Sequence, residues 1–195
     1  MQYSLLRKLR EKPFFTVKDL EALLGIQRGS ARLLCHRYTK AGLFIRLKKN
    51  FYVLAEAWDA FSQEELLRVS NFLQVPSYIS FTTALSFYEV TTQVQRDFFE
   101  SASTRRSERY NIKGVVFNYY KLQEKLYFDF VKERELFIAT REKAFVDALY
   151  LHSFGKYRLD LSAINMERLD RKRIDILSAR YPEKTRNVIR RICGI

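Results

Sequence analysis

Two short helical patterns joined by a tight turn dominate the N-terminal part of this sequence and restrict how it can fold. The first pattern repeats apolar residues at the spacing of a buried helix face: Val17, Leu20, Leu23 and Leu24. Thr16 stands before it as a predicted N-cap, and Gly25 is predicted to end it. A second helix is expected over residues 28–41, and a short helix over residues 2–10 is expected ahead of both.

The helix predicted over residues 28–41 has two chemically different sides. Its apolar side is expected to carry Ala31, Leu34, Cys35, Tyr38 and Ala41. Its other side is expected to carry a cationic stripe of Arg28, Arg32, His36 and Lys40, with Ser30 and Arg37 nearby. This is the plan of a helix-turn-helix, whose second helix enters the major groove of DNA. Arginine suits guanine or phosphate, and Gln27 suits adenine. The alternative is a solvated face of a small helical bundle.

A hairpin is predicted directly after these helices. Residues 44–47 and 51–54 are rich in β-branched and aromatic side chains and read as two short strands. The residues between them form a cationic tip: Lys48, Lys49 and Asn50. Helices followed by such a hairpin make a winged helix, and the tip would then lie against phosphates beside the groove. The hairpin could instead cover the core with Phe51 and Val53, and both roles are compatible because strand residues alternate faces.

The formal net charge of +13 is concentrated at the two ends of the sequence. Residues 1–54 carry 12 basic and 3 acidic side chains, a balance of +9. Residues 55–166 carry 14 basic and 15 acidic side chains, whereas residues 167–195 carry 9 and 4, a balance of +5. Localised basicity favours a polyanionic partner, most often nucleic acid. A solvated surface of lysine and arginine is the alternative.

The remaining sequence mixes strand and helix patterns. Extended segments are expected over residues 94–103, 114–122, 125–131 and 137–140, with the basic stretch 104–113 in a loop or hairpin. Helices are expected after a cap at Ser80, from Arg141 with one buried face, and by pattern from Leu161 onward, the last of them starting at Pro182.

The predicted fold class is therefore α+β. A winged helix-turn-helix is expected over residues 1–55, a linking helix over residues 56–75, and a mixed α/β C-terminal domain with a basic helical tail over residues 76–195. The linking helix should end before Pro76. No internal repeat interrupts this organisation.

The sequence does not favour an enzyme or a metal protein. Its cysteines and histidines are few: Cys35, Cys193, His36 and His152. Neither a disulfide framework nor a Cys or His metal centre is expected from them. Carboxylates for a metal nuclease are scattered over Glu133, Glu135, Glu142, Asp147 and Asp170. Adjacent helical residues diverge by about 100°, so Cys35 and His36 would make a poor nucleophile–base pair. We therefore predict a non-enzymatic protein with no cofactor and no metal.

Composition and segment length point to a soluble, cytoplasmic protein. Hydrophobic residues make up 47% of the chain, too many for a disordered sequence. No apolar run reaches the roughly 18 residues that a membrane span needs. The first residues also lack the apolar stretch of a signal peptide.

Three stretches form a pattern when they are taken together: residues 50–54, 78–88 and 139–149. In this order they resemble the AbiEi family of antitoxins, which are bacterial transcriptional regulators from abortive-infection toxin–antitoxin loci. The family often has Gly before Tyr-Val-Leu, where this chain has Asn50 or Phe51, and Pro before Glu-Lys-Ala, where it has Arg141. The chain is thus similar to a divergent member.

The resemblance implies a DNA-binding N-terminal domain and a C-terminal antitoxin domain. It implies repression of the protein's own promoter at inverted repeats, and a nucleotidyltransferase-like toxin that is opposed without a stable complex.

A second basic surface is expected from Arg105, Arg106, Arg109, Lys172, Arg173, Arg186, Arg190 and Arg191. It would serve nucleic acid or the antitoxin activity, or be only solvated. The alternative function is a winged-helix RNA-binding or general interaction protein without operator specificity.

Overall fold

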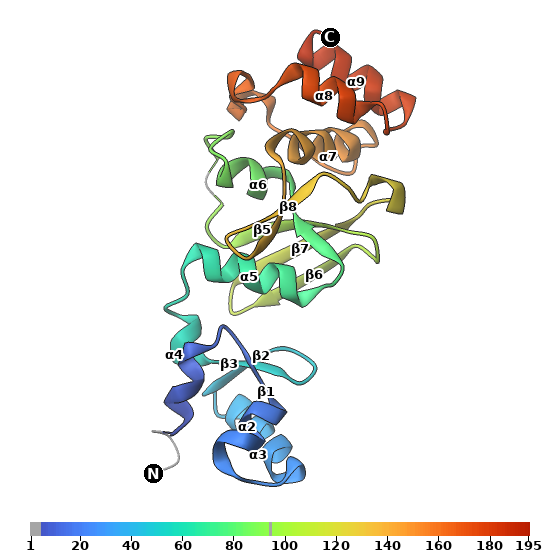
Figure 1. The fold of residues 1–195 in the computed structure, drawn as a ribbon. Helices are drawn as coiled ribbons and strands as arrows, with labels where there is room; N and C mark the ends of the chain where they lie inside the picture. Colours follow the sequence, from blue (N-terminus) through green and yellow to red (C-terminus); the bar gives the residue numbers. More distant parts are fainter. Residues whose placement is uncertain (1–4, 94) are drawn as a thin grey trace. The chain divides into compact units, whose positions relative to one another are not determined.

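The computed structural model describes residues 5–93 and 95–195. These form two compact units, the first ending at Val69 and the second starting at Ser70. The first unit contains η1 (Arg7–Glu11), β1 (Phe15–Thr16), α2 (Val17–Leu24), α3 (Arg28–Lys40), β2 (Phe44–Lys48), β3 (Phe51–Leu54) and α4 (Ala55–Trp58) (Figure 1). Helix α5 (Gln63–Leu73) runs from the first unit into the second. Of the helix predicted over residues 2–10, the first three residues lie outside the described residues, and the rest is mainly the 3-10 helix η1.

The helix pair of the first unit is set by local signals in its sequence. Thr16 caps α2 through a capping box: its hydroxyl accepts from the N–H of Asp19, and the Asp19 carboxylate accepts from the N–H of Thr16 at 2.8 Å. Gly25 ends α2 in the left-handed conformation at φ +63°, which glycine adopts without steric cost. Leu20, Ala31 and Cys35 are fully buried between the elements of this unit, as the predicted apolar faces require.

A three-stranded antiparallel sheet completes the first unit, in the order β1-β3-β2. Phe15 pairs with Tyr52 and Ile45 pairs with Val53, and the register of β2 against β3 shifts between Arg46 and Lys48. Asn50 turns the β2–β3 hairpin with φ +66°, a conformation that asparagine tolerates better than most residues. The predicted strand pair is confirmed.

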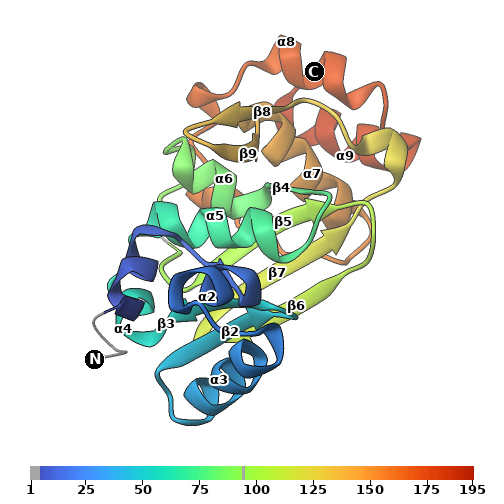
Figure 2. The same cartoon turned by 60° about the horizontal axis from the view of Figure 1, so that its bottom comes forward.

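The second unit is built on a six-stranded mixed sheet in the order β6-β7-β5-β4-β9-β8 (Figure 2). Its strands are β4 (Ser77–Ile79), β5 (Phe98–Ser103), β6 (Glu108–Ile112), β7 (Val115–Lys121), β8 (Phe130–Glu133) and β9 (Leu136–Ala139). Its helices are α6 (Phe81–Phe87), α7 (Arg141–Ser153), α8 (Arg171–Ser178) and α9 (Glu183–Cys193), with short 3-10 turns η2 (Glu124–Leu126), η3 (Leu161–Ala163) and η4 (Met166–Arg168). The chain is therefore mixed α/β, and the basic stretch 104–113 enters the β6–β7 hairpin.

Helices cover both faces of this sheet. On one face, the hydroxyl of Ser70 at the end of α5 lies 3.0 Å from that of Ser101 in β5, and the hydroxyl of Tyr119 in β7 donates to the carbonyl of Ser70. The preceding residue of β5, Glu100, points to the opposite face and accepts from the N–H of Thr82 in α6. Helix α7 packs against α6, and α8 and α9 lie against α7 (Figure 1).

Helix α7 is buried on all sides, because the sheet, α6 and the two C-terminal helices surround it. Its predicted apolar face is buried, yet so are Glu142, Lys143 and Asp147, and the expectation of one buried face is therefore wrong. The Lys143 ammonium contacts the Asp147 carboxylate and donates to the hydroxyls of Tyr78 at 2.9 Å and Tyr181 at 2.7 Å. A hydrogen-bonded polar cluster thus joins β4, α7 and the loop before α9.

Two further sequence predictions differ from the structure. The single linking helix is two helices, α4 and α5, because residues 59–62 leave the helical conformation between them. Ser80 stands at the N-cap position of α6, but its hydroxyl donates to Asp147 at 2.9 Å instead of capping the helix. Among the described residues, no helix has the length and apolarity needed to cross a membrane.

Candidate nucleic-acid interface

The exposed side of α3 carries the cations that the sequence analysis selected. Arg28, Arg32, His36, Arg37 and Lys40 are all exposed, and Ala31 and Cys35 on the other side are buried. The helix contains no acidic residue that would offset this charge. The predicted division of α3 into an apolar and a cationic side therefore holds in the structure.

The N-terminal turn of α3 is open. Gln27 occupies the N-cap position but makes no side-chain capping bond, and both Gln27 and Ser30 are exposed. A Cβ added at Gly29 would meet no heavy atom within 4 Å, so no neighbour within the chain requires a glycine there. The φ of Gly29 also lies outside the left-handed range. Neither packing nor backbone conformation requires glycine at position 29. The absence of a side chain there leaves the backbone of the first turn of α3 open to the approach of another molecule.

Leu33 was not selected from the sequence, although it is 58% exposed. At 100° per residue it lies between Lys40 and Arg37 on the cationic side of α3. Its helical spacing, which places it beside Arg37 and Lys40, is the signal that could have found it. Apolar side chains on a recognition helix can contact the thymine methyl group.

The tip of the β2–β3 hairpin presents the second predicted set of cations. Lys49 and Asn50 are exposed, while Lys48 is half-buried, with its ammonium 5.1 Å from the centre of the Phe51 ring. Val53 in β3 is buried. The hairpin therefore both covers the core and carries a cationic tip.

The expected second basic surface is not a single cationic patch in the structure. Arg105 and Arg106 are exposed ahead of β6, where Arg106 pairs with Glu108 at 2.7 Å. Arg109 in β6 lies over the ring of Phe98, 6.0 Å from its centre. Arg106 and Arg109 therefore already have partners within the second unit, and the Glu108 carboxylate offsets the charge of Arg106.

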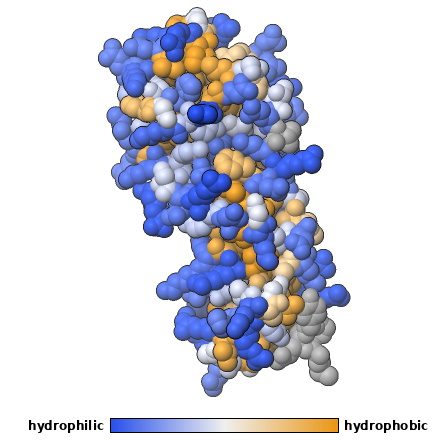
Figure 3. Space-filling view, turned by 180° about the vertical axis from the view of Figure 1, so that it is seen from behind, coloured by the Kyte–Doolittle hydropathy of each residue, from blue (hydrophilic) through white to orange (hydrophobic). Residues whose placement is uncertain are grey.

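The basic residues of α8 and α9 also differ from one another. Lys172, Arg190 and Arg191 are exposed, whereas Arg173 pairs with Asp129 at 2.9 Å. The prediction that Arg186 points outward is wrong, because it is half-buried and its Nε is buried without a hydrogen-bond partner among the described residues. Hydrophobic atoms interrupt the hydrophilic surface at this end of the molecule, and Ile176 of α8 is 73% exposed (Figure 3).

The residues that the sequence analysis considered for catalysis are either buried or bound to other groups of the fold. Cys35 is buried in the first unit, and this burial raises the pKa of its thiol to about 11, away from the reactive range. Asp147 belongs to the polar cluster on α7, and Asp170 caps α8 by accepting the N–H of Lys172 at 2.9 Å. Glu133, Glu135 and Glu142 have partners in Tyr88, Lys132 and Arg141, respectively. Within the described part of the chain, no group of three or more potential metal ligands is placed to hold an ion.

Two helices joined by a tight turn, the second with a cationic exposed side, are typical of transcriptional regulators. Residues 4–55 match the model of a family described as "Transcriptional regulator, AbiEi antitoxin", and the resemblance predicted from the sequence is confirmed over this segment. The match supports a role as an antitoxin and regulator. No curated protein and no solved structure matches the chain.

Proposed function

We propose that the first unit is a winged helix-turn-helix domain that binds double-stranded DNA, and that this protein is the repressor and antitoxin of a bacterial toxin–antitoxin locus. It represses its own promoter at inverted repeats in the cytoplasm. It counters a nucleotidyltransferase-like toxin without a stable complex between the two proteins. The family match over residues 4–55 supports this proposal.

The observation that carries the proposal is the exposed cationic side of α3. Arg32, His36 and Lys40 recur every fourth residue on the same side as Arg37, and the opposite side is held in the core by Ala31. A rigid helix with exposed cations meets phosphates along the groove and can present side chains to base edges. The open turn at Gly29 lets the N-terminus of α3 come close to the DNA backbone, where free helix N–H groups attract phosphate.

The hairpin supports the same docking. In chain order the unit has a helix, a strand, two helices and a two-stranded hairpin, which is the order of a winged helix. Lys49 and Asn50 at its tip would contact phosphates, a role that positions the protein without reading the sequence. Lys48 would contribute charge from the base of the tip, beside Phe51.

The second unit is proposed to carry the antitoxin activity. It has its own sheet and core, and the middle of the chain is close to neutral, which gives it little electrostatic attraction to DNA. Of the predicted second basic surface, Arg105, Lys172, Arg190 and Arg191 are exposed and have no ion-pair partner among the described residues, and these cations could act on the toxin or its substrate.

The test compares the full-length protein and its variants on the promoter duplex and on a random duplex, across a range of salt concentrations. Arg32→Ala should weaken binding to the promoter by about 1–3 kcal/mol and reduce the preference for it. Lys49→Ala should weaken binding to both duplexes alike and flatten the salt dependence. Lys125→Ala, which removes an exposed lysine of η2 in the second unit, is the matched control and should change neither.

Two results would contradict the proposal. If Arg32→Ala and Lys49→Ala have identical effects on both duplexes, Arg32 does not read bases and α3 does not lie in the major groove as proposed. Tighter binding to double-stranded RNA than to either DNA duplex would instead favour the RNA-binding alternative. The major groove of A-form RNA is too narrow for side chains to read, so α3 would then not act by reading base edges in that groove.

A further inference from the structure

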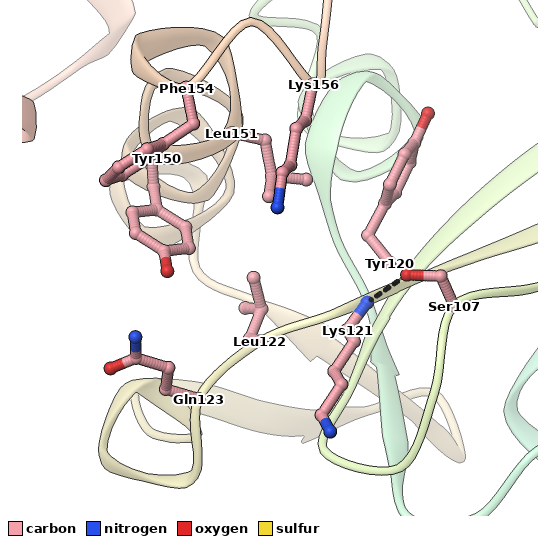
Figure 4. A pocket seen from close by; sticks show the side chains of 9 residues that line it. All are labelled: Ser107, Tyr120, Lys121, Leu122, Gln123, Tyr150, Leu151, Phe154 and Lys156. Atoms are coloured by element: carbon pink, nitrogen blue, oxygen red, sulfur yellow. Dashed lines mark hydrogen bonds between the residues drawn. The ribbon is translucent and has the colours of Figure 1, made fainter.

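A cavity of about 680 Å³ lies in the second unit, and its lining residues all belong to that unit. It opens where β7 ends and where α7 ends (Figure 4). Its lining consists of Ser107, Tyr120, Lys121, Leu122, Gln123, Tyr150, Leu151, Phe154 and Lys156. The volume falls within the range of about 300–1,000 Å³ that is usual for small-molecule sites. The function proposed above makes no use of this cavity.

The charge of the lining is entirely positive. Lys121 and Lys156 are its ionisable side chains other than the tyrosines, and no carboxylate lines it. Both lysines are exposed, and neither ammonium group has a hydrogen-bond or ion-pair partner among residues 5–93 and 95–195. Lys156 points its ammonium into the space between Tyr150 and Tyr120 (Figure 4). The side chain of Lys121 extends from the rim away from Lys156 (Figure 4), so Lys156 supplies the cation that would select an anionic ligand inside the cavity.

Aromatic rings form the walls of the same cavity. Tyr150 and Phe154 lie on one side and Tyr120 on the other (Figure 4). Tyr150 is held in place, because its ring packs edge-on against Phe154 at 5.4 Å and against Tyr181 at 5.6 Å. Phe154 is 42% exposed, and the Lys184 ammonium lies over its ring, 5.0 Å from the centre, so a ligand would stack on the part of the ring that Tyr150 and Lys184 leave open. A planar ring that enters the cavity would gain stacking area there.

Polar groups beside these rings would give such a ligand direction. Gln123 offers an amide that can both donate and accept, and its side chain points toward the wall formed by Tyr150 (Figure 4). Leu122 and Leu151 close the floor with apolar atoms. The cavity therefore combines an apolar floor, aromatic walls, an amide and the Lys156 cation.

We propose that this cavity binds a mononucleotide, that is, a nucleobase that carries a phosphate group. The base would stack against Phe154 and Tyr150, and the phosphate would bind Lys156. Neither half of the ligand alone uses all these groups, so a nucleoside and inorganic phosphate should each bind more weakly than the mononucleotide.

Isothermal titration calorimetry of the full-length protein tests this proposal. The probes are AMP, GMP, CMP and UMP, the four corresponding nucleosides, and inorganic phosphate. At least one mononucleotide should bind with one-to-one stoichiometry, and its nucleoside and phosphate should each bind about tenfold more weakly or worse. Lys156→Met keeps the apolar stem but removes the charge, and should weaken binding by about tenfold. Phe154→Leu keeps an apolar side chain without the ring and should also weaken it.

The matched control is Lys125→Met, an exposed lysine outside the cavity lining, which should leave binding unchanged. Because Lys156 is exposed, its variant should keep the melting temperature of the parent protein and its binding to the promoter duplex. The proposal is overturned if no mononucleotide binds at millimolar concentration, or if Lys156→Met and Lys125→Met behave alike. It is also overturned if a single-stranded oligonucleotide binds far more tightly than every mononucleotide, because the cavity would then be part of an RNA or DNA groove.

Discussion

Gly29 is the residue at which folding and the proposed DNA binding make opposite demands. It lies in the first turn of α3, is exposed, and has open space where a Cβ would stand. Alanine there should stabilise the protein by about 0.5–1 kcal/mol, because glycine loses more backbone entropy in a helix. The added methyl group should nevertheless weaken binding to the promoter duplex, because it keeps the α3 backbone away from the phosphates. Urea unfolding and fluorescence anisotropy of Gly29→Ala measure the two effects.

The control for this prediction is Ser30→Ala, a neighbouring exposed position that already has a Cβ. It should cost at most one hydrogen bond to DNA, about 1 kcal/mol. If Gly29→Ala binds the promoter as well as the parent protein, close approach at the start of α3 is not part of the interface.

Glu100 should make the stability of the second unit depend on pH. Burial raises the pKa of its carboxyl group to about 7, although hydrogen bonds from the Tyr157 hydroxyl at 2.7 Å and the Thr82 N–H at 3.2 Å partly oppose this. The folded state therefore holds the proton more tightly than the unfolded chain, whose carboxyl group has a pKa of 4.5. Its contribution is fully present below pH 4.5 and is lost as the pH rises through about 7. The loss amounts to about 3 kcal/mol.

Glu100→Gln isolates this effect, because the amide keeps the shape of the side chain and cannot ionise. The contribution of Glu100 is the difference between the unfolding free energies of the parent protein and the variant, because the other titrating groups are common to both. This difference should fall between about pH 5 and pH 8. In the variant that component should be absent. Parallel pH profiles for the two proteins would show that Glu100 does not hold a proton near neutral pH.

At the scale of elements, α7 organises the second unit through its buried charges. Lys143 and Asp147 are one helical turn apart and fully buried, and Tyr78, Tyr181 and Ser80 bring their hydroxyls to them. Every polar atom in this cluster therefore needs its neighbours, since buried charge without a partner is costly. The strand β4 and the loop between α8 and α9 are tied to α7 by the same set of hydrogen bonds.

Removing one charge should therefore be worse than removing both. Lys143→Met leaves the Asp147 carboxylate buried without its counter-charge and should destabilise the protein by about 3–5 kcal/mol. The double variant Lys143→Met/Asp147→Leu replaces the pair with apolar groups and should lose less, although three hydroxyls lose a partner. Chemical denaturation of both variants measures the difference. A double variant that is less stable than Lys143→Met would show that the hydroxyl network, and not the charge pair, dominates.

Elements with local signals were predictable from the sequence, and elements that depend on distant partners were not. The capping box at Thr16, the turn at Gly25 and the two strands around Lys49 involve residues close in the chain. The burial of α7 depends instead on Tyr78, 65 residues before Lys143, and on Tyr181, 38 residues after it. Periodicity on α7 itself could not reveal those partners, so its charged residues were read as exposed.

The same reasoning applies to the candidate interface. The cationic side of α3 followed from helical spacing alone, whereas Leu33 was overlooked because a leucine gives no sign of exposure. The half-buried position of Arg186 depends on how α9 docks onto α7, and this docking cannot be inferred from the sequence of α9 alone. The cavity near Lys156 brings together the ends of β7 and α7, which only the sheet topology places side by side.

At the scale of the whole molecule, α5 is the segment shared by the two units. Their boundary falls between Val69 and Ser70, inside this helix, and its last turns are bound to the second unit. Asn71 both donates to the carbonyl of Phe137 at 3.0 Å and accepts from the N–H of the same residue at 2.8 Å. A cut within α5 would therefore remove a helix end that the sheet uses, and a fragment for DNA binding should keep the helix whole.

The two proposed activities should separate along this division. A fragment of residues 1–75 retains the whole first unit and should bind the promoter duplex, more weakly than the full chain because the basic tail is lost. It should not protect cells from the toxin, because the sheet of the second unit is missing. The reciprocal variant is the full chain with Arg32→Ala and Lys49→Ala, expressed from an unrelated promoter. Both substituted residues are exposed, so the variant should fold normally and protect cells while binding the promoter poorly. Loss of protection in this variant, with its melting temperature intact, would mean that neutralisation of the toxin requires DNA binding and that the two units do not act independently.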